Sequence, residues 1–412
     1  MHLEDITNIL NLQGIIVTNL IYGFEDRVCI EVEPIDYTQP CPCCKSANIK
    51  RRGSSGIRRV KHLPIFQNEV ILKVPKIRMS CKDCDASFSW EYTFITGKSH
   101  YTNEFKEFIA IKVPGATVIH CAKTLKIPYS TVERIYKNYI DYVVPQLQKK
   151  VILESSNTNK LVLGMDDFAI RKGHTYNTGI HDLRNGTLLE IISGRKLEQL
   201  RRNKNVNPEL FELKPFAIVM DLASYYHTFA KEVYPDAIRI ADRFHVNSYA
   251  MDALKEVRKR MSCDLDPAAR TMLKRNKSVL EKRNEYLTLK EVEMLNQLLS
   301  LSSDLKAVYE WKEKFIEWYD CCSSVIQATN LFDKWCREGH SLNIPEVERA
   351  LITFENWRQE IINYHYCRYT NAAVEGRNGK IKSIQRRHYF TRNKDYYKKR
   401  ILLECNNHFL TV

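Results

Sequence analysis

The sequence predicts a multidomain α/β protein, and three observations support this prediction. The chain has 412 residues, more than one hydrophobic core usually serves, so two to four domains are expected. Strand-like and helix-like runs alternate between residues 161 and 250, whereas residues 251–365 show almost no strand pattern. Before residue 90, cysteines occur in two closely spaced pairs. A metal-binding region, an α/β region and a helical region are therefore expected.

The composition is that of a folded, strongly basic protein. Hydrophobic residues make up 44% of the chain, charged residues 27%, and the net charge is +14. A chain this basic often binds a polyanion, most commonly nucleic acid, although generic basicity is the alternative. No apolar run approaches the roughly 18 residues of a membrane span, and the start MHLEDITNILNLQG lacks the basic region of a signal peptide. We therefore expect a cytoplasmic protein without a membrane partner.

Two CxxC pairs near the N-terminus predict a structural zinc site. The chain has thirteen cysteines, an odd number in a long and apparently cytoplasmic protein, so metal ligands are a better explanation than disulfides. Four thiolates hold tetrahedral zinc and leave no coordination position open for chemistry. Two unrelated pairs of free cysteines are the alternative, and Cys43 is either a substitute ligand or a bystander. The candidate ligands are Cys41, Cys44, Cys81 and Cys84.

Two shorter segments of the N-terminal half also suggest local structure. The glycine-rich basic stretch RRGSSGIRRVKH, residues 51–62, is expected to form a turn or loop. In HCAKTLKIPYSTVERIYKNYI, residues 120–140, the apolar spacing suits two short helices around a turn, with Ser130 and Thr131 as caps of the second. A helix-turn-helix would place the second helix in a DNA major groove, and an ordinary helical hairpin is the alternative. The candidate DNA contacts there are Ser130, Thr131, Arg134 and Lys137.

The α/β region follows residues 152–160, a polar stretch that is expected to be a linker. Asn185-Gly186 between two strand-like runs is a strong signal for a tight hairpin. A third strand precedes this hairpin, and two later strands are each followed by a helix-like run. Three antiparallel strands and then alternating strand and helix is the order of a ribonuclease H-like α/β fold. The five predicted strands are LVLGMDDFAI, TYNTGIHDL, TLLEIIS, PFAIVMDLA and DAIRIADRFHV.

Acidic residues follow three of the apolar runs in this region. They are Asp166, Asp221 and Asp242. Parallel strands of an open sheet bring their carboxyl ends to one edge, so these side chains are expected to lie together. Asp167 follows Asp166 directly and therefore points to the opposite face of its strand. A lone aspartate in such a place is usually a helix cap or a salt-bridge partner, but three in succession favour Mg²⁺ or Mn²⁺.

A fourth candidate segment, RYTNAAVEGRNGKIKSIQRR, lies at residues 368–387. If it is helical, Asn371, Glu375, Asn378 and Lys382 share one face, which would suit a metal ion beside a phosphate backbone. A solvated amphipathic surface is the alternative. Residues 376–400 are rich in lysine, arginine and tyrosine, a combination that suits backbone contacts and base stacking. The candidate DNA contacts here are Arg377, Lys380, Arg386 and Arg387.

With these blocks in this order, the chain resembles bacterial insertion-sequence transposases of the DDE type, specifically the ISL-three family. The resemblance is carried by the CxxC pairs, the predicted helix-turn-helix and four further blocks, GMDDFAIRKGHTY, VMDLASYY, ADRFH and TNAAVEGRNGKIKSIQRR. One departure is Asp167, where a glutamate is expected. This residue is not among the carboxylates to which the resemblance assigns catalysis.

The resemblance implies a function and a site. Asp166, Asp221 and Glu375 would be the catalytic carboxylates and would bind Mg²⁺ or Mn²⁺, while Asp242 and His245 would be accessory. Asn371, Asn378 and Lys382 are further accessory candidates. The partner would be double-stranded DNA, both the terminal inverted repeats of the transposon and the target. Cleavage and strand transfer would need at least two chains on DNA, in association with the bacterial nucleoid.

Two alternatives to this function remain. One is a regulatory or domesticated DNA-binding protein without catalysis, and the other is a structure-specific nuclease of the same fold. The predicted architecture is a zinc ribbon and helix-turn-helix followed by a ribonuclease H-like catalytic domain with a large all-helical insertion. The predicted divisions are residues 1–95 (zinc-binding), 96–150 (helix-turn-helix), 161–250 (first part of the catalytic core), 251–365 (helical insertion) and 366–412 (last part of the core, with the basic segment).

Overall fold

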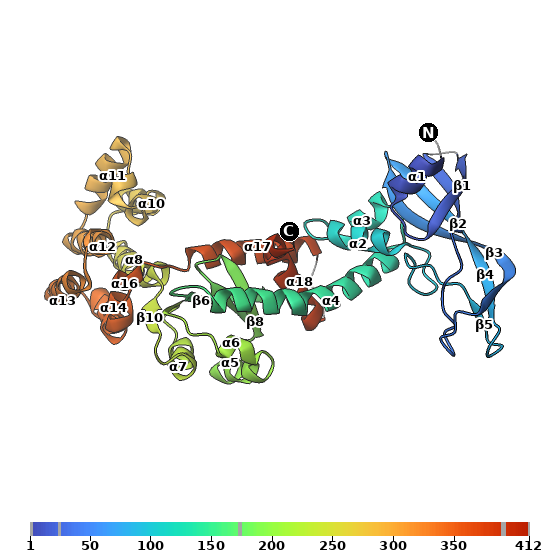
Figure 1. Ribbon diagram of the computed structural model, residues 1–412. Coiled ribbons are helices and arrows are strands. Elements are labelled where there is room, and N and C mark those ends of the chain that lie inside the picture. The colour runs from blue at the N-terminus through green and yellow to red at the C-terminus, as the bar shows by residue number, and fades with distance from the viewer. Residues whose placement is uncertain (1–2, 24–25, 172–174, 389–392, 411–412) are drawn as a thin grey trace. The chain divides into compact units, whose positions relative to one another are not determined.

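The structure is a computed structural model, shown in Figure 1, in which the contacts group the chain into two units. The units are Met1–Tyr142 and Val143–Val412. The boundary falls inside a helix, and the finer division that the sequence predicts stays a prediction. In the part of the chain that the structure describes, no helix is long and apolar enough to cross a membrane. The description covers all residues except 1–2, 24–25, 172–174, 389–392 and 411–412.

The first unit is built on a five-stranded sheet that follows helix α1 (Leu3–Leu10). Alternate residues of the central strands are buried, as in Val70, Leu72 and Val74, because one face of the sheet packs into the core. The strand order is β1 (Ile15–Tyr22), β2 (Arg27–Pro34), β4 (Asn68–Cys81) and β3 (Ile49–Ile65), and β5 (Ser87–Ser89) pairs with β4.

The predicted loop at residues 51–62 is wrong, because strand β3 runs through it. The pairing of β3 with β4 shifts register between Arg51 and Gly53 and again between Ser54 and Ile57. Gly53 and Gly56 lie at these irregularities with φ of +122° and +132°, which a residue with a side chain rarely adopts. The glycines therefore form bulges that keep the strand paired rather than ending it.

Three helices complete the first unit, α2 (Asn103–Lys112), α3 (Val118–Thr124) and α4 (Tyr129–Ser156). Helix α4 has 28 residues and continues into the second unit, so the predicted short helix and most of the predicted linker at residues 152–160 are wrong. The predicted caps are also wrong. The carbonyl of Pro128 accepts the N–H groups of Thr131 and Val132, so the first turn of α4 begins before Ser130.

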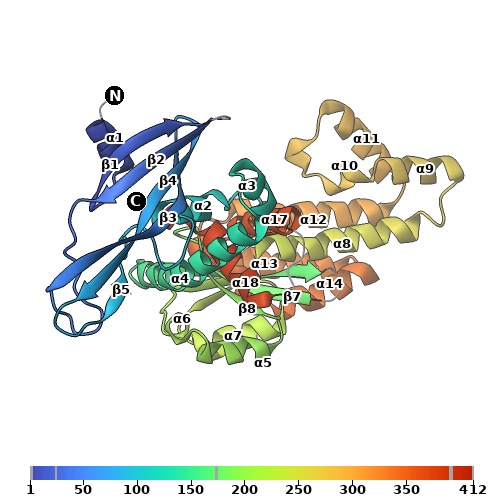
Figure 2. The same ribbon diagram turned by 90° about the vertical axis from the view of Figure 1, so that its right-hand side faces the viewer.

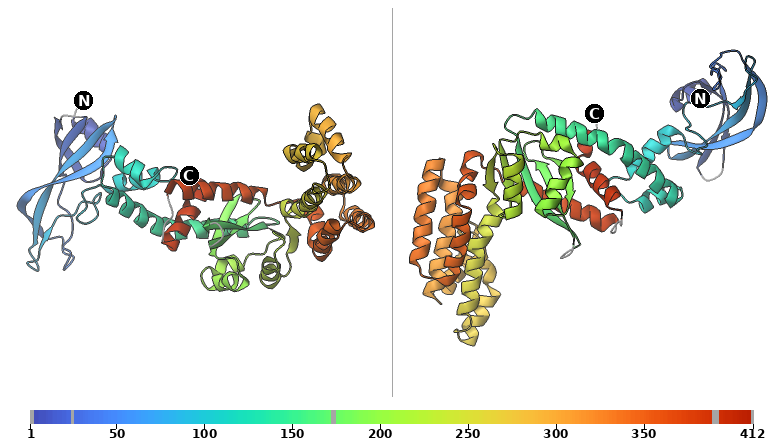
Figure 3. Two further views of the ribbon diagram at one scale, coloured as in Figure 1. Left: turned by 180° about the vertical axis from the view of Figure 1, so that it is seen from behind. Right: turned by 90° about the horizontal axis from the view of Figure 1, so that it is seen from below.

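The second unit contains the five predicted strands in one sheet, but the fifth ends at Ala241, and its predicted last residues, RFHV, instead begin helix α8 (Arg243–Met261). Strands β6, β7 and β8 are antiparallel, with the predicted hairpin at Gly186 (φ +70°), and β9 and β10 run parallel to β6. Helices α17 and α18 lie on one side of this sheet and α5 and α7 on the other (Figure 3). The sheet order is β10 (Ile238–Ala241), β9 (Ala217–Met220), β6 (Val162–Arg171), β7 (Thr175–Asp182) and β8 (Thr187–Ser193).

Short helices connect the strands of this sheet. Helix α7 joins β9 to β10, as the sequence predicts, and the other connecting helices lie between β8 and β9. They are α5 (Leu197–Arg202), α6 (Pro208–Phe211) and α7 (Ser224–Val233). The closing helices of the chain are α17 (Ala372–His388) and α18 (Lys394–Cys405).

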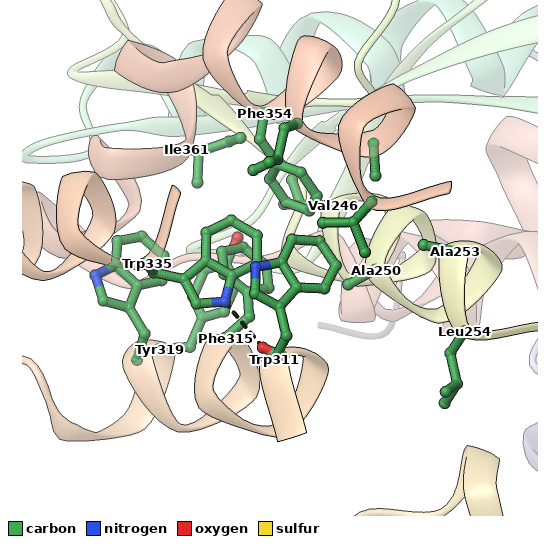
Figure 4. Packing of buried hydrophobic residues seen from close by; sticks show 14 of the residues in the cluster. Val246, Ala250, Ala253, Leu254, Trp311, Phe315, Tyr319, Trp335, Phe354 and Ile361 are labelled. Carbon is green, nitrogen blue, oxygen red and sulfur yellow. Dashed lines mark hydrogen bonds between the residues drawn. The ribbon is translucent and has the colours of Figure 1, made fainter. Parts of the chain in front are cut away.

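Residues 251–365 are all described, and they contain no strand, as the sequence predicts. Figure 2 labels helices α8 to α14 of this region. Trp311, Phe315 and Tyr319 recur at helical spacing on α12 and enter one aromatic core (Figure 4). There Trp311 stacks on Trp335 with ring centroids 4.4 Å apart, and the Trp335 indole N–H donates to the carbonyl of Trp311. The helices are α8 (Arg243–Met261), α9 (Pro267–Arg275), α10 (Lys277–Glu281), α11 (Leu289–Leu299), α12 (Ser303–Cys321), α13 (Val325–Ser341), α14 (Pro345–Asn356), α15 (Arg358–Ile362) and α16 (Tyr364–Cys367).

Candidate functional site

The first unit brings the four predicted cysteines together. One sulfur from each of Cys41, Cys44, Cys81 and Cys84 lies within 4.8 Å of all the others. The sulfurs of Cys41 and Cys84 are 3.7 Å apart, and those of Cys44 and Cys81 are 3.5 Å apart. Zinc–sulfur bonds of about 2.3 Å in a tetrahedron place sulfurs about 3.8 Å apart, so the residues fit zinc.

Local turns explain why the sulfurs converge. Each pair is followed by a residue with left-handed backbone, Lys45 (φ +63°) and Asp85 (φ +54°), which folds the chain back over the sulfurs. Asp83 links the two turns by accepting hydrogen bonds from the Ser46 hydroxyl and from the Asn48 amide. Backbone N–H groups of Cys44 and Cys43 lower the pKa of Cys41 to about 7, whereas the neighbouring sulfurs raise the pKa of Cys44 and of Cys84. The positive charge of a zinc ion would favour the thiolate form of all four.

Cys43 lies outside this cluster. Its side chain is exposed, and the four-cysteine group does not include it. Cys43 therefore behaves as the bystander of the two possibilities that the sequence leaves open.

The second unit gathers the predicted carboxylates at one edge of its sheet. Asp166, Asp221 and His245 form one group of possible metal ligands, and Asp242, His245 and Glu375 form another. Within each group the ligand atoms lie within 4.8 Å of one another. His245 is common to both, and its Nε2 is 3.1 Å from Asp221 Oδ1.

Strand register explains why the three aspartates meet. Met220 on β9 is level with Met165 on β6 and with Ala241 on β10. The residue after each of these three is an aspartate, so the carboxylates emerge at the same height along parallel strands. Strand β6 continues beyond Asp166 to Arg171 because β7 pairs with it, whereas β9 and β10 stop.

Asp167 belongs to neither ligand group. Its Oδ2 is 2.9 Å from Arg195 Nη1, and the Arg195 guanidinium lies over the ring of Tyr176, 4.1 Å from its centroid. Of the two adjacent carboxylates, one therefore faces the cluster and the other has a salt-bridge partner. The sequence does not identify Arg195 as that partner, because the contact joins residues that are far apart in the chain.

Helix α17 carries Glu375, and hydrogen bonds near its start fix it to the sheet. The backbone N–H of Asn371 donates to Asp242 Oδ1 (2.8 Å), and the Asn371 side-chain amide donates to the carbonyl of Met165 (3.1 Å). One turn beyond Glu375, the Asn378 amide donates to Asp166 Oδ2 (2.7 Å). The two asparagines that the sequence places on the Glu375 face thus orient the carboxylates.

Gly164 allows this helix to approach closely. A Cβ atom at Gly164 would lie 2.8 to 2.9 Å from Leu183, from the Asn371 side chain and from Val374 on α17. Sequence reasoning missed this role, although an isolated glycine within a strand often marks a close backbone approach.

Burial and mutual repulsion make the carboxylates unusually basic. Burial raises the pKa of Asp166 to about 6. For Asp221, burial together with the charges of Asp166 and Asp242 raises the pKa to about 8. Burial also raises the pKa of Asp242. A divalent cation would relieve this repulsion, and carboxylate oxygens are the ligands that Mg²⁺ and Mn²⁺ prefer.

The predicted DNA-contacting residues near the C-terminus fall into two groups. Arg377 contacts His181 (3.2 Å), the Lys380 ammonium donates to the carbonyl of Glu404, and Arg387 lies 3.5 Å from the Glu404 carboxylate. Arg386 is exposed, and so is Lys382, which the sequence gives as an accessory candidate rather than a DNA contact. Residues 389–392 of this basic segment lie outside the described residues.

In the first unit, the predicted contacts lie in the N-terminal part of α4. Ser130 and Arg134 are exposed, Thr131 is partly buried, and Lys137 pairs with Glu133. No described contact shows what these side chains bind, so their role in DNA recognition stays a prediction.

Comparisons with known proteins agree with this arrangement. Residues 38–84, which include all four zinc-ligand candidates, match the family described as the zinc-finger of transposase IS204/IS1001/IS1096/IS1165. The chain is 24% identical over 375 residues to the transposase for insertion sequence element IS1001 of Bordetella parapertussis, with 89% of each chain covered. Residues 163–401, more than half of the chain, match the ISL3 transposase family model.

These matches identify the general activity as well as the zinc site. The four N-terminal cysteines form a zinc ribbon with structural zinc, and the chain is a DNA-binding, DNA-cleaving transposase. The chain belongs to the ISL3 family of insertion-sequence transposases.

Proposed function

We propose that this transposase works by DDE chemistry, with Asp166, Asp221 and Glu375 as the carboxylates that hold Mg²⁺ or Mn²⁺. The observation that carries the proposal is the convergence of these residues, which come from within β6, from the end of β9 and from helix α17, in adjoining ligand groups. When bound, the cations supply Lewis-acid activation of the attacking oxygen and stabilisation of the leaving oxygen. Asn378 and Asn371 keep the carboxylates in register with one another.

The reaction would be two in-line displacements at phosphorus. In the first, a water oxygen attacks the phosphate at the transposon end, the bond from phosphorus to the 3′-oxygen breaks, and a 3′-hydroxyl is released. In the second, that 3′-hydroxyl attacks a target phosphate, and the bond from the target phosphorus to its own 3′-oxygen breaks. His245 lies 3.1 Å from Asp221, which fits a role in ordering that carboxylate.

The sheet supports a ribonuclease H-like catalytic core. Three antiparallel strands are followed by two strands parallel to the first, which is the order expected from the sequence. The helical segment Arg243–Cys367 then stands between the second aspartate and the glutamate as an insertion.

Recognition of the terminal inverted repeats would fall to the first unit. The zinc ribbon and the turn between α3 and α4 are the elements proposed to read DNA, with Ser130, Thr131, Arg134 and Lys137 near the groove. Arg377, Lys380, Arg386 and Arg387 would contact the phosphate backbone with little sequence preference.

Joining two ends requires at least two protomers on DNA. The bound protein would be associated with the nucleoid.

A cleavage assay with labelled DNA that carries the flanking inverted repeats tests the proposal. Asp166→Asn and Asp221→Asn should each reduce cleavage by at least about 100-fold in Mg²⁺ or Mn²⁺, because a carboxylate ligand is lost. Binding of the same DNA should stay within about twofold of wild type, because end recognition belongs to the first unit.

Two results would count against the proposal. Cleavage retained in either variant would remove that residue from the centre. Specific binding without cleavage in any metal, already in the wild-type chain, would favour a regulator over a catalyst.

A further inference from the structure

Asp242 is a fourth carboxylate at the edge of the sheet, and its two oxygens have different surroundings. The side chain is only 1% exposed. Oδ1 accepts the backbone N–H of Asn371 at 2.8 Å, which fixes the residue just before α17. Oδ2 is fully buried and has no hydrogen-bond partner among the described residues.

No basic side chain in the described structure forms an ion pair with Asp242. The neighbouring Arg243 is directed elsewhere, since its guanidinium pairs with Asp320 (2.8 Å) and lies 4.7 Å from the Tyr319 ring centroid. The His245 side chain and the backbone N–H groups of His245 and Phe244, at the start of α8, provide some positive charge near the carboxylate. This is little compensation, because Asp166, Asp221 and Glu375 add three more carboxylates nearby.

A buried carboxylate oxygen without a partner is costly unless a positive group meets it. Two potential metal ligands lie near Asp242: one oxygen of Asp242, one oxygen of Glu375 and one nitrogen of His245 lie within 4.8 Å of one another. Ligands on opposite sides of Mg²⁺ are about 4.2 Å apart, so small side-chain adjustments would let one cation reach both carboxylates.

We propose that Asp242 is a fourth carboxylate ligand of the divalent-cation centre, which it shares with Glu375. Through its other oxygen, Asp242 also holds the start of the helix that carries Glu375. Asp242 would thus have two roles in the centre: it positions Glu375, and it supplies negative charge that binds the cation. The inference rests on the proposed function, because it adds a ligand to the same centre.

Mn²⁺ binding to the full-length, zinc-loaded protein without DNA tests this inference. The signal of free Mn²⁺ in electron paramagnetic resonance measures affinity without any need for activity. Asp242→Asn keeps an oxygen that can accept the Asn371 N–H but removes the charge, whereas Asp242→Ala removes both. If Asp242 is a ligand, both variants weaken Mn²⁺ binding by at least about tenfold. Asp252 is an exposed aspartate on helix α8, which begins directly after Asp242, so Asp252→Asn is the matched control and should bind as wild type.

Several outcomes separate the possibilities. Wild-type affinity in Asp242→Asn with loss in Asp242→Ala would show that Asp242 only holds the helix, and would overturn the inference. Loss in Asp221→Asn with no loss in either Asp242 variant would overturn it too, while the proposed function would stand. Absence of Mn²⁺ binding by the wild-type chain would contradict both.

A second measurement needs no variant and so does not depend on whether the variants fold. In wild-type crystals soaked in Mn²⁺, an anomalous difference peak within about 2.5 Å of Asp242 Oδ2 would support the inference. A peak bound by Asp166 and Asp221, with none at Asp242, would contradict it.

Discussion

The zinc ribbon and the proposed carboxylate centre of this transposase are built in opposite ways. The zinc ribbon takes its four ligands from two tight turns, and each turn supplies two sulfurs from residues three apart in the chain. The proposed carboxylate centre takes its candidate ligands from β6, the ends of β9 and β10, and α17, which span more than two hundred residues. Local spacing therefore specifies the first centre, whereas the second exists only when the sheet and α17 have assembled.

Electrostatics separate the centres further. Four thiolates close the zinc site and leave no position for a substrate, as a structural role requires. The carboxylate centre is partly open, since Glu375 is exposed, and its buried aspartates repel one another. The first centre stabilises a fold. The second concentrates negative charge that a divalent cation would neutralise.

The largest expected effect is the loss of zinc. Because zinc-binding free energy in such small sites is on the order of 10 kcal/mol, Cys41→Ser or Cys84→Ser should unfold the ribbon and abolish binding to inverted-repeat DNA. Purified wild-type protein should carry about one zinc per chain, as measured by atomic absorption. Cys43→Ser is the matched control and should keep both zinc and DNA binding. A zinc-free chain whose ribbon stays folded would contradict the structural role of zinc in this comparison.

The next effect concerns the contact between α17 and the sheet. Gly164→Ala places a Cβ less than 3 Å from α17 side chains, so it should lower stability by about 1–3 kcal/mol and displace Glu375. Thermal unfolding and cleavage both measure the result. Gly376→Ala, on the same helix with open space around it, should leave stability unchanged or slightly raised. Equal effects of the two variants would show that α17 does not depend on close packing.

The sequence predicts the two centres to different extents. The CxxC spacing identified the zinc ligands, and the Asn-Gly hairpin and apolar runs identified the second sheet, because each signal is local. The roles of Gly164 and Arg195, and the hydrogen bond from Asn371 to Asp242, depend on tertiary contacts that no local pattern encodes. Strand β3 and the full length of α4 were missed because glycine and polar residues were interpreted as breaks, and tertiary pairing overrode them.

The smallest expected effect is a pH dependence of stability without divalent cations. The pKa values of Asp166 (about 6) and Asp221 (about 8) are above the value of about 4 for an unfolded chain. These groups therefore make their full contribution to the free energy of unfolding below pH 4, and this contribution is lost as the pH rises through 8. Asp221→Asn should remove much of this dependence. The melting temperature of the variant relative to that of wild type should therefore be higher at pH 9 than at pH 5.

Thermal unfolding at pH 5, pH 8 and pH 9, with and without Mg²⁺, measures this effect. Added Mg²⁺ should raise the wild-type melting temperature at pH 8 and have less effect on Asp221→Asn. A constant difference between the two proteins across the pH range would show that Asp221 does not carry the repulsion described above.

The most direct measurement is cleavage of labelled inverted-repeat DNA in Mg²⁺, Mn²⁺ or EDTA, with wild type beside Glu375→Gln and Glu310→Gln. Glu310 is an exposed glutamate on α12 and serves as the matched control. The account predicts metal-dependent cleavage at the repeat boundary by wild type and Glu310→Gln, with loss of at least about 100-fold in Glu375→Gln. Equal cleavage by all three proteins, or cleavage that continues in EDTA, would contradict it.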